Sequence, residues 1–376
     1  MLTSRPVQSR VEQIKAKRAG VGLRACDLHR ASPGYTLFAP MTRERTVYLI
    51  DLEARIEHTW GLPYSPGLYG YLTDRGTLFY NGRTTEATSA LVRDGPWKGG
   101  AAGEMDWSGR VLWEVRHPDH HHDGRLLRNG NVILLCTTPI PAELAARVRG
   151  GLPGTEHEGE MYGDYLVEMR TDGTVVWEWR SWEHLDPEAD RITYAGERRH
   201  GWTHANTVAE MPDGNLLVSF RNISTVTVVE RASGRIVWKL GTPTIAQQHA
   251  PVPLDNGNLL IFDNGTHRPD RSWPFSRVIE VEPATQEIVW SYQARPAFDF
   301  FSPYISNAER LANGNTLVCE GNFGRLFEVT PDGELVWEFV NPYFGPSKAD
   351  PEGPPTNAVF RAFRYEEDRI RKARMT

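Results

Sequence analysis

Residues 125–135 read RLLRNGNVILL, and the same pattern recurs as EMPDGNLLVSF (210–220), PLDNGNLLIF (253–262) and RLANGNTLVCE (310–320). The stretch LTDRGTLFY (72–80) is a degenerate copy. In each full copy an Asn-Gly or Asp-Gly pair separates two apolar runs, and both residue types tolerate the positive φ of a tight turn. The pattern therefore predicts a β-hairpin that is repeated along the chain.

A tryptophan-bearing strand is the second recurring feature. Its copies read IEHTW (56–60), GRVLWEV (109–115), GTVVWEW (173–179), GRIVWKL (234–240), QEIVWSY (286–292) and GELVWEF (333–339). Together with the hairpin and one intervening strand, each copy completes a unit of about four antiparallel strands. Six such units predict an all-β fold, a six-bladed β-propeller of four-stranded antiparallel blades, with the tryptophans packed between strands and blades.

The first unit lacks an inner strand, because it begins directly at GYTLFAPM (34–41). The segment NAVFRAFRY (357–365) has the missing pattern, so we predict that a C-terminal strand completes the first blade and closes the ring. The predicted domains are an N-terminal extension (1–30), the propeller (31–366) and a charged C-terminal tail (367–376), both flanks being short helices or disordered. The predicted blades span 34–61 with 357–366, then 66–115, 120–180, 204–240, 249–293 and 304–340.

Composition narrows the classes of partner. The 376 residues include 42 Lys and Arg against 48 Asp and Glu, a net charge of −6, so neither nucleic acid nor an anionic membrane is an expected partner. No apolar run approaches the roughly 18 residues of a membrane span. Three scattered cysteines and a basic N-terminus without an apolar core predict a cytoplasmic protein without a disulfide framework. No phosphate loop, nucleophile elbow or paired metal-ligand motif occurs, so no cofactor is predicted.

Superposing the repeats on their turn glycines (130, 214, 257 and 314) places residues of different blades at equivalent positions. Ten residues upstream stand His120, His204, Gln247 and Tyr304; eight residues upstream stand His122, Asn206, His249 and Ser306. Positions two apart at the start of an inner strand share a face, which we expect to line the central channel. Four of the 12 histidines occupy these eight positions. By the same alternation, His117 and His121 should point elsewhere.

The second strand of each blade returns to the same mouth of the channel, where it carries Arg83, Arg221 and Asn264. Histidine and arginine side chains there suit a small anionic substrate. Nearby aromatic residues favour an aromatic ring in that substrate: Tyr304, Phe298, Phe300 and Phe301. The predicted partner is therefore a small aromatic or anionic molecule.

Several stretches resemble the bacterial arylsulfotransferase family, whose members transfer a sulfuryl group between phenols without a nucleotide donor. They are HHD (121–123) before RLLRNGNVILL, WTHANTVAEMPDGNLLVSFRNIS (202–224), QQHAPVPLDNGNLLIFDNG (247–265), SRVIEV (276–281) and SPYISNAERLANGNTLVCEGN (302–322). The resemblance implies the same six-bladed fold, a transferase activity and ping-pong kinetics.

Residue by residue, the resemblance implies that His249 becomes transiently sulfated. It also implies that His122, His204 and Arg221 grip the sulfuryl oxygens, the cationic donors stabilising charge in the transition state. The remaining channel positions are predicted to bind substrate: His120, Asn206, Tyr304, Arg83 and Asn264.

Two alternatives use the same scaffold. In the first, His122, His204 and His249 bind one transition metal, such as Zn, Mn or Fe, with an open fourth position. The protein would then be a lyase or hydrolase acting on a phenolic or acidic small molecule. In the second, the propeller is not an enzyme and binds partners through one face.

Overall fold

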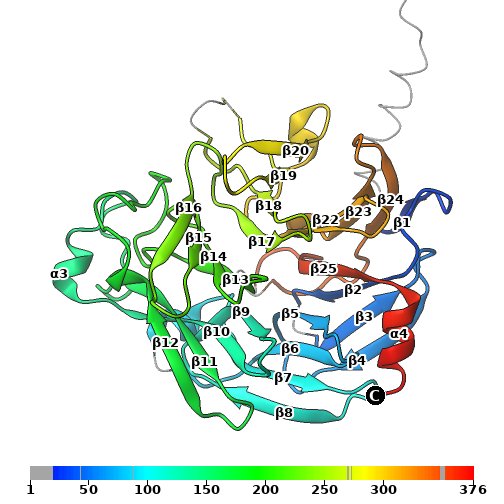
Figure 1. The fold of residues 1–376 in the computed structure, drawn as a ribbon, viewed down its shortest axis with the longest axis horizontal. Coiled ribbons are helices and arrows are strands. Elements are labelled where there is room, and N and C mark those ends of the chain that lie inside the picture. The colour runs from blue at the N-terminus through cyan, green and yellow to red at the C-terminus, as the bar shows by residue number, and fades with distance from the viewer. Residues whose placement is uncertain (1–19, 43, 88, 269–270, 272, 348–351) are drawn as a thin grey trace, which may run out of the picture.

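The computed structural model describes residues 20–376 except 43, 88, 269–270, 272 and 348–351. The described residues form six antiparallel sheets that follow one another around a central axis, which confirms the six-bladed propeller (Figure 1). We number the blades 1 to 6 in chain order and give each from its innermost strand outward.

Blade 1 contains β25 (Val359–Tyr365), β2 (Tyr35–Pro40), β3 (Thr46–Ile50) and β4 (Ile56–Gly61). Blade 2 contains β5 (Pro66–Leu72), β6 (Leu78–Arg83), β7 (Gly100–Met105) and β8 (Val111–Arg116). Blade 3 contains β9 (His120–Leu126), β10 (Val132–Pro139), β11 (Tyr162–Met169) and β12 (Val175–Arg180). Blade 4 contains β13 (Ala205–Glu210), β14 (Leu216–Phe220), β15 (Thr225–Val229) and β16 (Ile236–Leu240). Blade 5 contains β17 (His249–Pro253), β18 (Leu259–Asp263), β19 (Arg277–Val281) and β20 (Ile288–Tyr292). Blade 6 contains β21 (Asn307–Arg310), β22 (Thr316–Glu320), β23 (Arg325–Val329) and β24 (Leu335–Val340).

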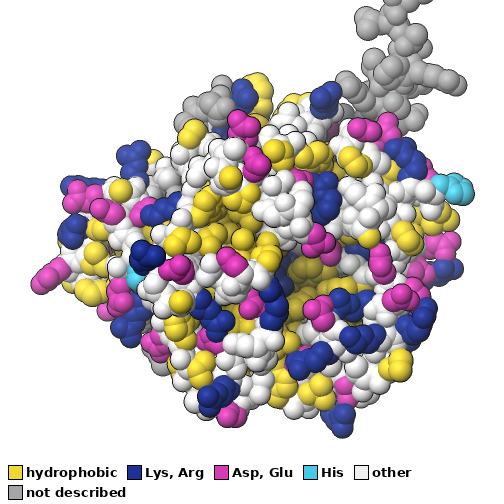
Figure 2. All heavy atoms as spheres, viewed as in Figure 1, with side chains coloured by type: hydrophobic (Ala, Val, Ile, Leu, Met, Phe, Trp, Pro, Cys, Tyr) yellow, Lys and Arg dark blue, Asp and Glu magenta, His cyan; other side chains and the backbone are white. Residues whose placement is uncertain are grey.

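Short helices lie in the connections and at the C-terminus. They are α2 (Ala90–Asp94), α3 (Ala142–Ala145), α4 (Glu367–Ala373) and the 3₁₀ turns η1 (Ser181–Glu183), η2 (Ala297–Asp299) and η3 (Gly321–Phe323). Within the described part of the chain, none is long and apolar enough to cross a membrane. Figure 2 shows acidic and basic side chains interspersed over the viewed face, as the small net charge suggests.

The closing strand pairs as predicted. β25 runs antiparallel to β2, with Phe38 opposite Ala362, so strands from the two ends of the chain share blade 1. The red β25 accordingly lies beside the blue β2 near the centre of Figure 1. Closure covers the inner edge of β2, which would otherwise be unpaired.

The N-terminal flank differs from the prediction. Residues 1–19 lie outside the described residues, but Gly22–Cys26 form β1, a fifth strand on the outer edge of blade 6. β1 pairs with β24, with Cys26 opposite Trp337. It covers an edge whose residues Val336 and Phe339 are buried, unlike the exposed outer strands of other blades. The segment occurs once in the sequence, so the repeat pattern could not reveal it.

The charged tail is a docked helix. Ile370 and Ala373 of α4 are fully buried, and Ile370 joins the apolar cluster between blades 1 and 2. Ala373 packs directly on the backbone of Gly76, where an added Cβ would meet its amide nitrogen at 2.9 Å. Arg369 pairs with Asp74 at 2.8 Å. The tail therefore covers the first two blades.

The asparagines beside the turn glycines explain why the Asn-Gly-Asn sequence recurs. Their side-chain amides donate hydrogen bonds to a buried glutamate on the third strand of the same blade. The pairs are Asn129 and Asn131 with Glu168 at 3.0 and 2.6 Å, Asn256 and Asn258 with Glu280 at 2.9 and 2.7 Å, and Asn315 with Glu328 at 2.7 Å. Glycine is required at these turns because of the backbone conformation and not because of crowding. Gly130 has φ +84°, whereas an added Cβ there would meet no neighbouring atom. Each hairpin is thus fixed to its own blade.

Tryptophans of the fourth strands connect neighbouring blades. In five of the six junctions an indole N–H donates to a backbone carbonyl in the last turn of the next blade. The bonds run from Trp60 to Asp106 (3.2 Å), Trp179 to Gly234 (2.7 Å), Trp238 to Pro283 (2.8 Å), Trp290 to Pro331 (2.8 Å) and Trp337 to Leu52 (2.9 Å). Blade 3 uses Trp179 rather than Trp177, and Trp113 instead donates to Glu104 of its own blade. The tryptophans of the fourth strands therefore join neighbouring blades mainly through a repeated hydrogen bond.

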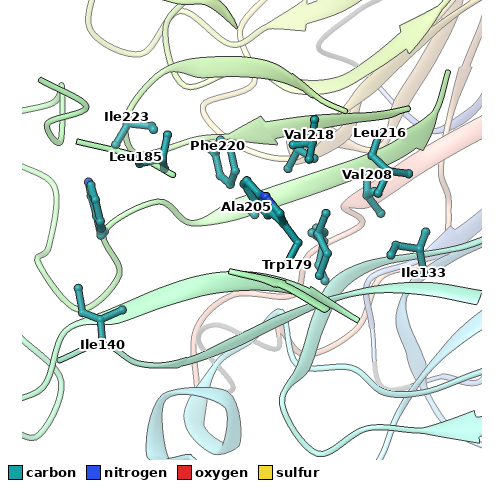
Figure 3. Packing of buried hydrophobic residues seen from close by; sticks show 14 of the residues in the cluster. Ile133, Ile140, Trp179, Leu185, Ala205, Val208, Leu216, Val218, Phe220 and Ile223 are labelled. Carbon is teal, nitrogen blue, oxygen red and sulfur yellow. The ribbon is translucent and has the colours of Figure 1, made fainter. Parts of the chain in front are cut away.

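Apolar side chains fill the space between the sheets. Between blades 3 and 4, Ile133 and Trp179 belong to one cluster with Val208, Val218 and Phe220 (Figure 3). Full burial of each such aliphatic or aromatic side chain contributes about 1.5–3 kcal/mol. These contacts hold the inner strands at a fixed distance and so determine where their first residues lie.

A buried ion pair at the axis joins the closing strand to two other blades. Arg361 of β25 donates to Asp123 of β9 at 3.1 Å and to Asn206 O and Thr207 Oγ1 of β13 at 2.9 Å each. Asp123 also accepts a hydrogen bond from the hydroxyl of Tyr69 in blade 2. Arg361 and Asp123 are 1% and 0% exposed, so each charge depends on its partner.

We predict that Arg361→Met destabilises the fold by about 3 kcal/mol, because buried Asp123 loses its nearer cation and keeps the more distant Arg125, whose Nε lies 3.7 Å from Asp123 Oδ1. The free energy of unfolding from urea titration measures this. Arg30→Met, which removes an exposed pair with Glu334, is the control and should lower the free energy of unfolding far less. Equal, small losses in both variants would contradict an essential axial pair.

Candidate functional site

Three of the predicted histidines gather at the starts of adjacent inner strands. His249 begins β17, His122 lies near the start of β9, and His204 directly precedes β13. The ring centroids of His122 and His204 are 4.8 Å apart. The proximity of His249 contributes to a lowered pKa of both rings. The structure thus brings these three side chains into one neighbourhood.

The backbone at these strand starts is left-handed. φ is +48° at His122 and at His204, +54° at Gln247 and +54° at Ile305. Positive φ is uncommon for residues other than glycine and is a strained exception for β-branched isoleucine. In β9 it accompanies a register shift against β10. Simple alternation of side chains therefore fails where the site is built.

His249 has a defined tautomer. Its Nδ1 lies 2.8 Å from Asn264 Oδ1, and its Nε2 accepts a hydrogen bond from the backbone N–H of Ile305 at 3.2 Å. The Asn264 amide is oriented in turn, since its Nδ2 donates to Ser302 O and Ile305 O at 2.8 and 3.0 Å. Nδ1 of His249 therefore carries the proton, and Nε2 carries the lone pair.

Trp97 forms one wall of the site. Its ring stacks on His122 at a centroid distance of 5.2 Å and meets His204 edge-on at 5.7 Å. The His204 ring is half-buried and forms no hydrogen bond with any residue that the structure describes. A polar group that enters the site can therefore bind His204 without displacing a protein partner.

Arg221 reaches the site paired with a carboxylate. Its Nη1 donates to Glu197 Oε2 at 2.6 Å and to Asn222 Oδ1 at 2.9 Å. Gln247 Nε2 donates to the same Glu197 oxygen at 2.6 Å. Burial alone would raise the pKa of Glu197, but the charge and hydrogen bonds of Arg221 and Gln247 hold it below its ordinary value. The side chain is thus a carboxylate that fixes Arg221.

Burial keeps the site imidazoles neutral. Desolvation, and then the neighbouring charges, lower the pKa of His122 and His204 well below the ordinary value. Desolvation and the charge of Arg221 lower the pKa of His249 to about 3. Neutral imidazole has a lone pair, so these rings act as nucleophiles or hydrogen-bond partners, not as fixed cations.

The other predicted substrate-binding residues lie around this centre. Both ring nitrogens of His120 contact backbone between blades 2 and 3, namely Gly100 N at 3.1 Å and Asp123 O at 3.3 Å. Burial lowers its pKa to about 3. The Asn206 amide is also engaged, since its Nδ2 donates to Gln248 O at 2.8 Å. These two residues support the inner strands.

Arg83 and Tyr304 lie further out. Arg83 ends β6 and donates from Nη1 to Pro96 O at 2.8 Å, next to Trp97 in the chain. Tyr304 is exposed in the connection between β20 and β21. Arg83 is therefore placed beside the segment that carries Trp97, and Tyr304 at the surface of the molecule.

Exposed aromatic residues share one end of the propeller. The connection into each inner strand and the connection between its second and third strands leave the sheet at the same end, because antiparallel strands alternate in direction. These connections carry Trp273, Phe298, Tyr304, Phe323 and Phe344, all exposed. Of the predicted aromatics, Phe300 instead belongs to the core between blades 5 and 6. An aromatic rim thus surrounds the mouth on the side of these two blades.

His121 is the residue that alternation misplaced. It is 2% exposed, and its Nδ1 lies 2.6 Å from Nδ1 of His122. The left-handed backbone at His122 turns both neighbouring rings inward. Trp97 and Glu197 were also missed, because they lie in connections outside the repeat.

The ligand atoms of the three histidines do not all lie within 4.8 Å of one another in this arrangement of side chains. Among the described residues, the only group of three with ligand atoms within 4.8 Å of one another is Asp94, His157 and Glu158. Arg93 already contacts both carboxylates there, at 2.9 and 3.7 Å. The geometry of the channel therefore gives the metal-dependent alternative no support.

Comparison with known proteins agrees with this arrangement of strands. The chain is 22% identical over 369 aligned residues to the arylsulfate sulfotransferase AssT of Escherichia coli O6:H1 (strain CFT073). The alignment covers 75% of this chain and 58% of that protein. A Bacteroides caccae protein of unknown function has a similar fold, with a TM-score of 0.52 and 14% identity over 89% of this chain and 100% of its own. The family model for arylsulfotransferase (ASST) matches residues 97–342, which contain all three histidines and Arg221. The chain belongs to the arylsulfotransferase family.

Proposed function

We propose that this chain moves a sulfuryl group from an aryl sulfate to a phenol through a sulfated intermediate on His249. The fixed tautomer of His249 carries the proposal, because Asn264 holds the proton on Nδ1 at 2.8 Å and leaves the lone pair on Nε2. With a pKa of about 3 the ring is neutral at physiological pH and needs no base to activate it. Family membership supports a transferase of this class.

In the first half-reaction, Nε2 of His249 forms a bond to sulfur while the bond from sulfur to the aryl oxygen breaks. The electron pair of that bond leaves with the phenolic oxygen. The backbone N–H of Ile305, which donates to Nε2 at 3.2 Å in the free protein, then loses its acceptor and can donate to a sulfuryl oxygen. In the second half-reaction, an acceptor phenol attacks sulfur and the electron pair returns to Nε2.

Arg221 supplies the charge that the sulfuryl oxygens require. Glu197 and Asn222 bind Nη1, and no residue in the described part of the chain binds Nε or Nη2. This edge of the guanidinium offers two parallel donors, the geometry that suits a pair of oxygens on sulfur. His122 and His204 complete the neighbourhood, and the aromatic rim of Trp273, Phe298, Tyr304, Phe323 and Phe344 would receive the aryl groups.

Protein freed of metal by a chelator should release nitrophenol from 4-nitrophenyl sulfate in a burst and retain about one acid-labile sulfuryl group per chain. Addition of phenol should restore turnover. His249→Asn should abolish the burst, whereas His58→Asn on the outer strand β4 should keep it. If activity instead requires a transition metal, and elemental analysis finds about one metal ion per chain, the proposed sulfuryl transfer to histidine would be wrong. The metal-dependent lyase or hydrolase would then be favoured.

Arg221→Lys should lower kcat/KM for the sulfate donor by about 10²–10³, because lysine keeps the charge but loses the parallel donors. Steady-state kinetics with 4-nitrophenyl sulfate measure this loss. Arg235→Lys, an exposed residue 74% accessible on the same blade, should change nothing. Near-normal kinetics of Arg221→Lys and Arg221→Ala would remove Arg221 from the site.

The single-turnover rate of sulfuryl uptake should stay nearly constant between pH 7 and pH 5. His249, with its pKa lowered to about 3, remains neutral throughout this range and is protonated only at lower pH. For a histidine with the ordinary pKa of about 6.5, the neutral fraction would instead fall about 25-fold between pH 7 and pH 5. A decline of that size, measured by rapid quench with folding checked by circular dichroism, would exclude His249 as the buried nucleophile.

A further inference from the structure

We propose that Asp164, His121 and His122 form a proton relay that gives a proton to the departing phenolic oxygen and takes one from the acceptor phenol. The proposal rests on the sulfuryl transfer proposed above and assigns its acid and base. It adds His121 and Asp164 as positioning residues, which act on substrate only through His122.

The three side chains form a continuous buried chain within blade 3, from β11 to β9. Asp164 Oδ1 lies 3.0 Å from His121 Nε2, an ion-pair distance that is not aligned as a hydrogen bond. His121 Nδ1 lies 2.6 Å from His122 Nδ1. The three side chains are only 2–5% exposed. Water therefore has little access to the chain of contacts.

Asp164 is held in place by the next blade. Its Oδ2 accepts hydrogen bonds from the backbone N–H of Ala205 at 2.7 Å and from the hydroxyl of Thr203. These contacts occupy one oxygen and leave Oδ1 toward His121. They also attach Asp164 to the segment that carries His204, which fixes the position of the carboxylate relative to His204.

The contact between the two imidazoles requires one proton between the Nδ1 atoms, since two lone pairs or two N–H groups would repel at 2.6 Å. Two arrangements satisfy this condition while a proton on His121 Nε2 faces the Asp164 carboxylate and His122 stays neutral. In the first, both rings are neutral: His121 carries its proton on Nε2, facing Asp164, and His122 carries its proton on Nδ1, which leaves a lone pair on Nε2. In the second, His121 is a cation beside Asp164, and His122 carries its proton on Nε2.

The two arrangements interconvert with balanced protons. When the aryl oxygen leaves, His122 gives it the Nε2 proton and takes the Nδ1 proton of His121, so both rings end neutral. When the acceptor phenol attacks, its hydroxyl proton moves to His122 Nε2, and the Nδ1 proton of His122 passes to His121. The positive charge is then stored on His121 beside the Asp164 carboxylate.

Storage on His121 avoids a cation at the sulfuryl site. Burial and the nearby imidazoles of His204, His121 and His249 lower the pKa of His122, and Arg361 adds to this effect. His121, in contrast, faces a carboxylate at 3.0 Å. The other rings in contact with His121 are Trp97 and His122, at 5.4 and 4.9 Å between centroids. The carboxylate therefore determines which imidazole carries the charge.

The first test needs no substrate. In Asp164→Asn the amide oxygen can still accept from Ala205, which directs the amide N–H₂ toward His121. Neutral His121 must then accept at Nε2 and donate from Nδ1, so His122 is held with its proton on Nε2. Nitrogen-15 NMR of labelled histidine should show both nitrogens of His121 protonated in the wild-type protein, and Nε2 of His121 without a proton in this variant. The same protonation of His121 in both proteins would overturn the relay.

The second test uses donors with different leaving groups. Asp164→Asn and His121→Phe should slow transfer from phenyl sulfate by about 10²-fold or more, because a basic phenolate needs a proton. They should slow transfer from 4-nitrophenyl sulfate much less, since nitrophenolate leaves without one. Glu168→Gln, which changes a buried carboxylate four residues further along β11, is the control and should affect both donors equally.

Equal losses with both donors in Asp164→Asn would mean a structural role and would overturn the relay. Absence of any transfer by the wild-type protein would instead overturn the proposed function. The tautomer measurement is made without substrate, so the two failures are distinguishable.

Discussion

The ion pair between Arg361 and Asp123 is the constraint on which the remaining structure depends. Two buried charges at the axis must pair, and the pairing requires β25 from the end of the chain to reach β9 in the middle. Asp123 follows His122 directly, and Arg361 also binds the backbone of Asn206, two residues after His204. The same contacts of Arg361 therefore close the ring and align the two strands that carry His122 and His204. A chain that fails to close would also fail to build the site.

The outer parts of the blades are held by repeated contacts that leave the channel free to vary. Indole N–H groups connect successive blades, and turn asparagines fix each hairpin to a buried glutamate. These contacts involve the outer strands and the turns. The first residues of the inner strands take no part in them and can therefore differ from blade to blade. Those positions are imidazole in blades 3, 4 and 5, and the strain of a positive φ is concentrated there. Rigid repeats thus support an irregular centre.

The centre consists of neutral rings that lie between one ion pair and one contact of a histidine with a carboxylate. Arg221 is held by Glu197 on one side, and His121 faces Asp164 on the other. Between them, burial keeps His122, His204 and His249 uncharged. In such a site of low dielectric, charge that develops on a sulfuryl group or a phenolic oxygen interacts strongly with fixed donors and carboxylates. The free protein avoids an unpaired charge, and the reaction supplies the charge that the site stabilises.

The sequence by itself determined the six blades, the closing strand at 357–365 and the grouping of His122, His204, His249 and Arg221, because hairpin turns and strand periods are local and repeat in register. It misplaced His121, because the left-handed backbone at His122 reverses the alternation that placed it. It also missed Trp97, Glu197 and β1, which occur once, outside the repeat, so no superposition could locate them. Only the tertiary structure decided these positions, since a side chain in a single-copy connection is placed by contacts with distant blades and not by the period of its own strand.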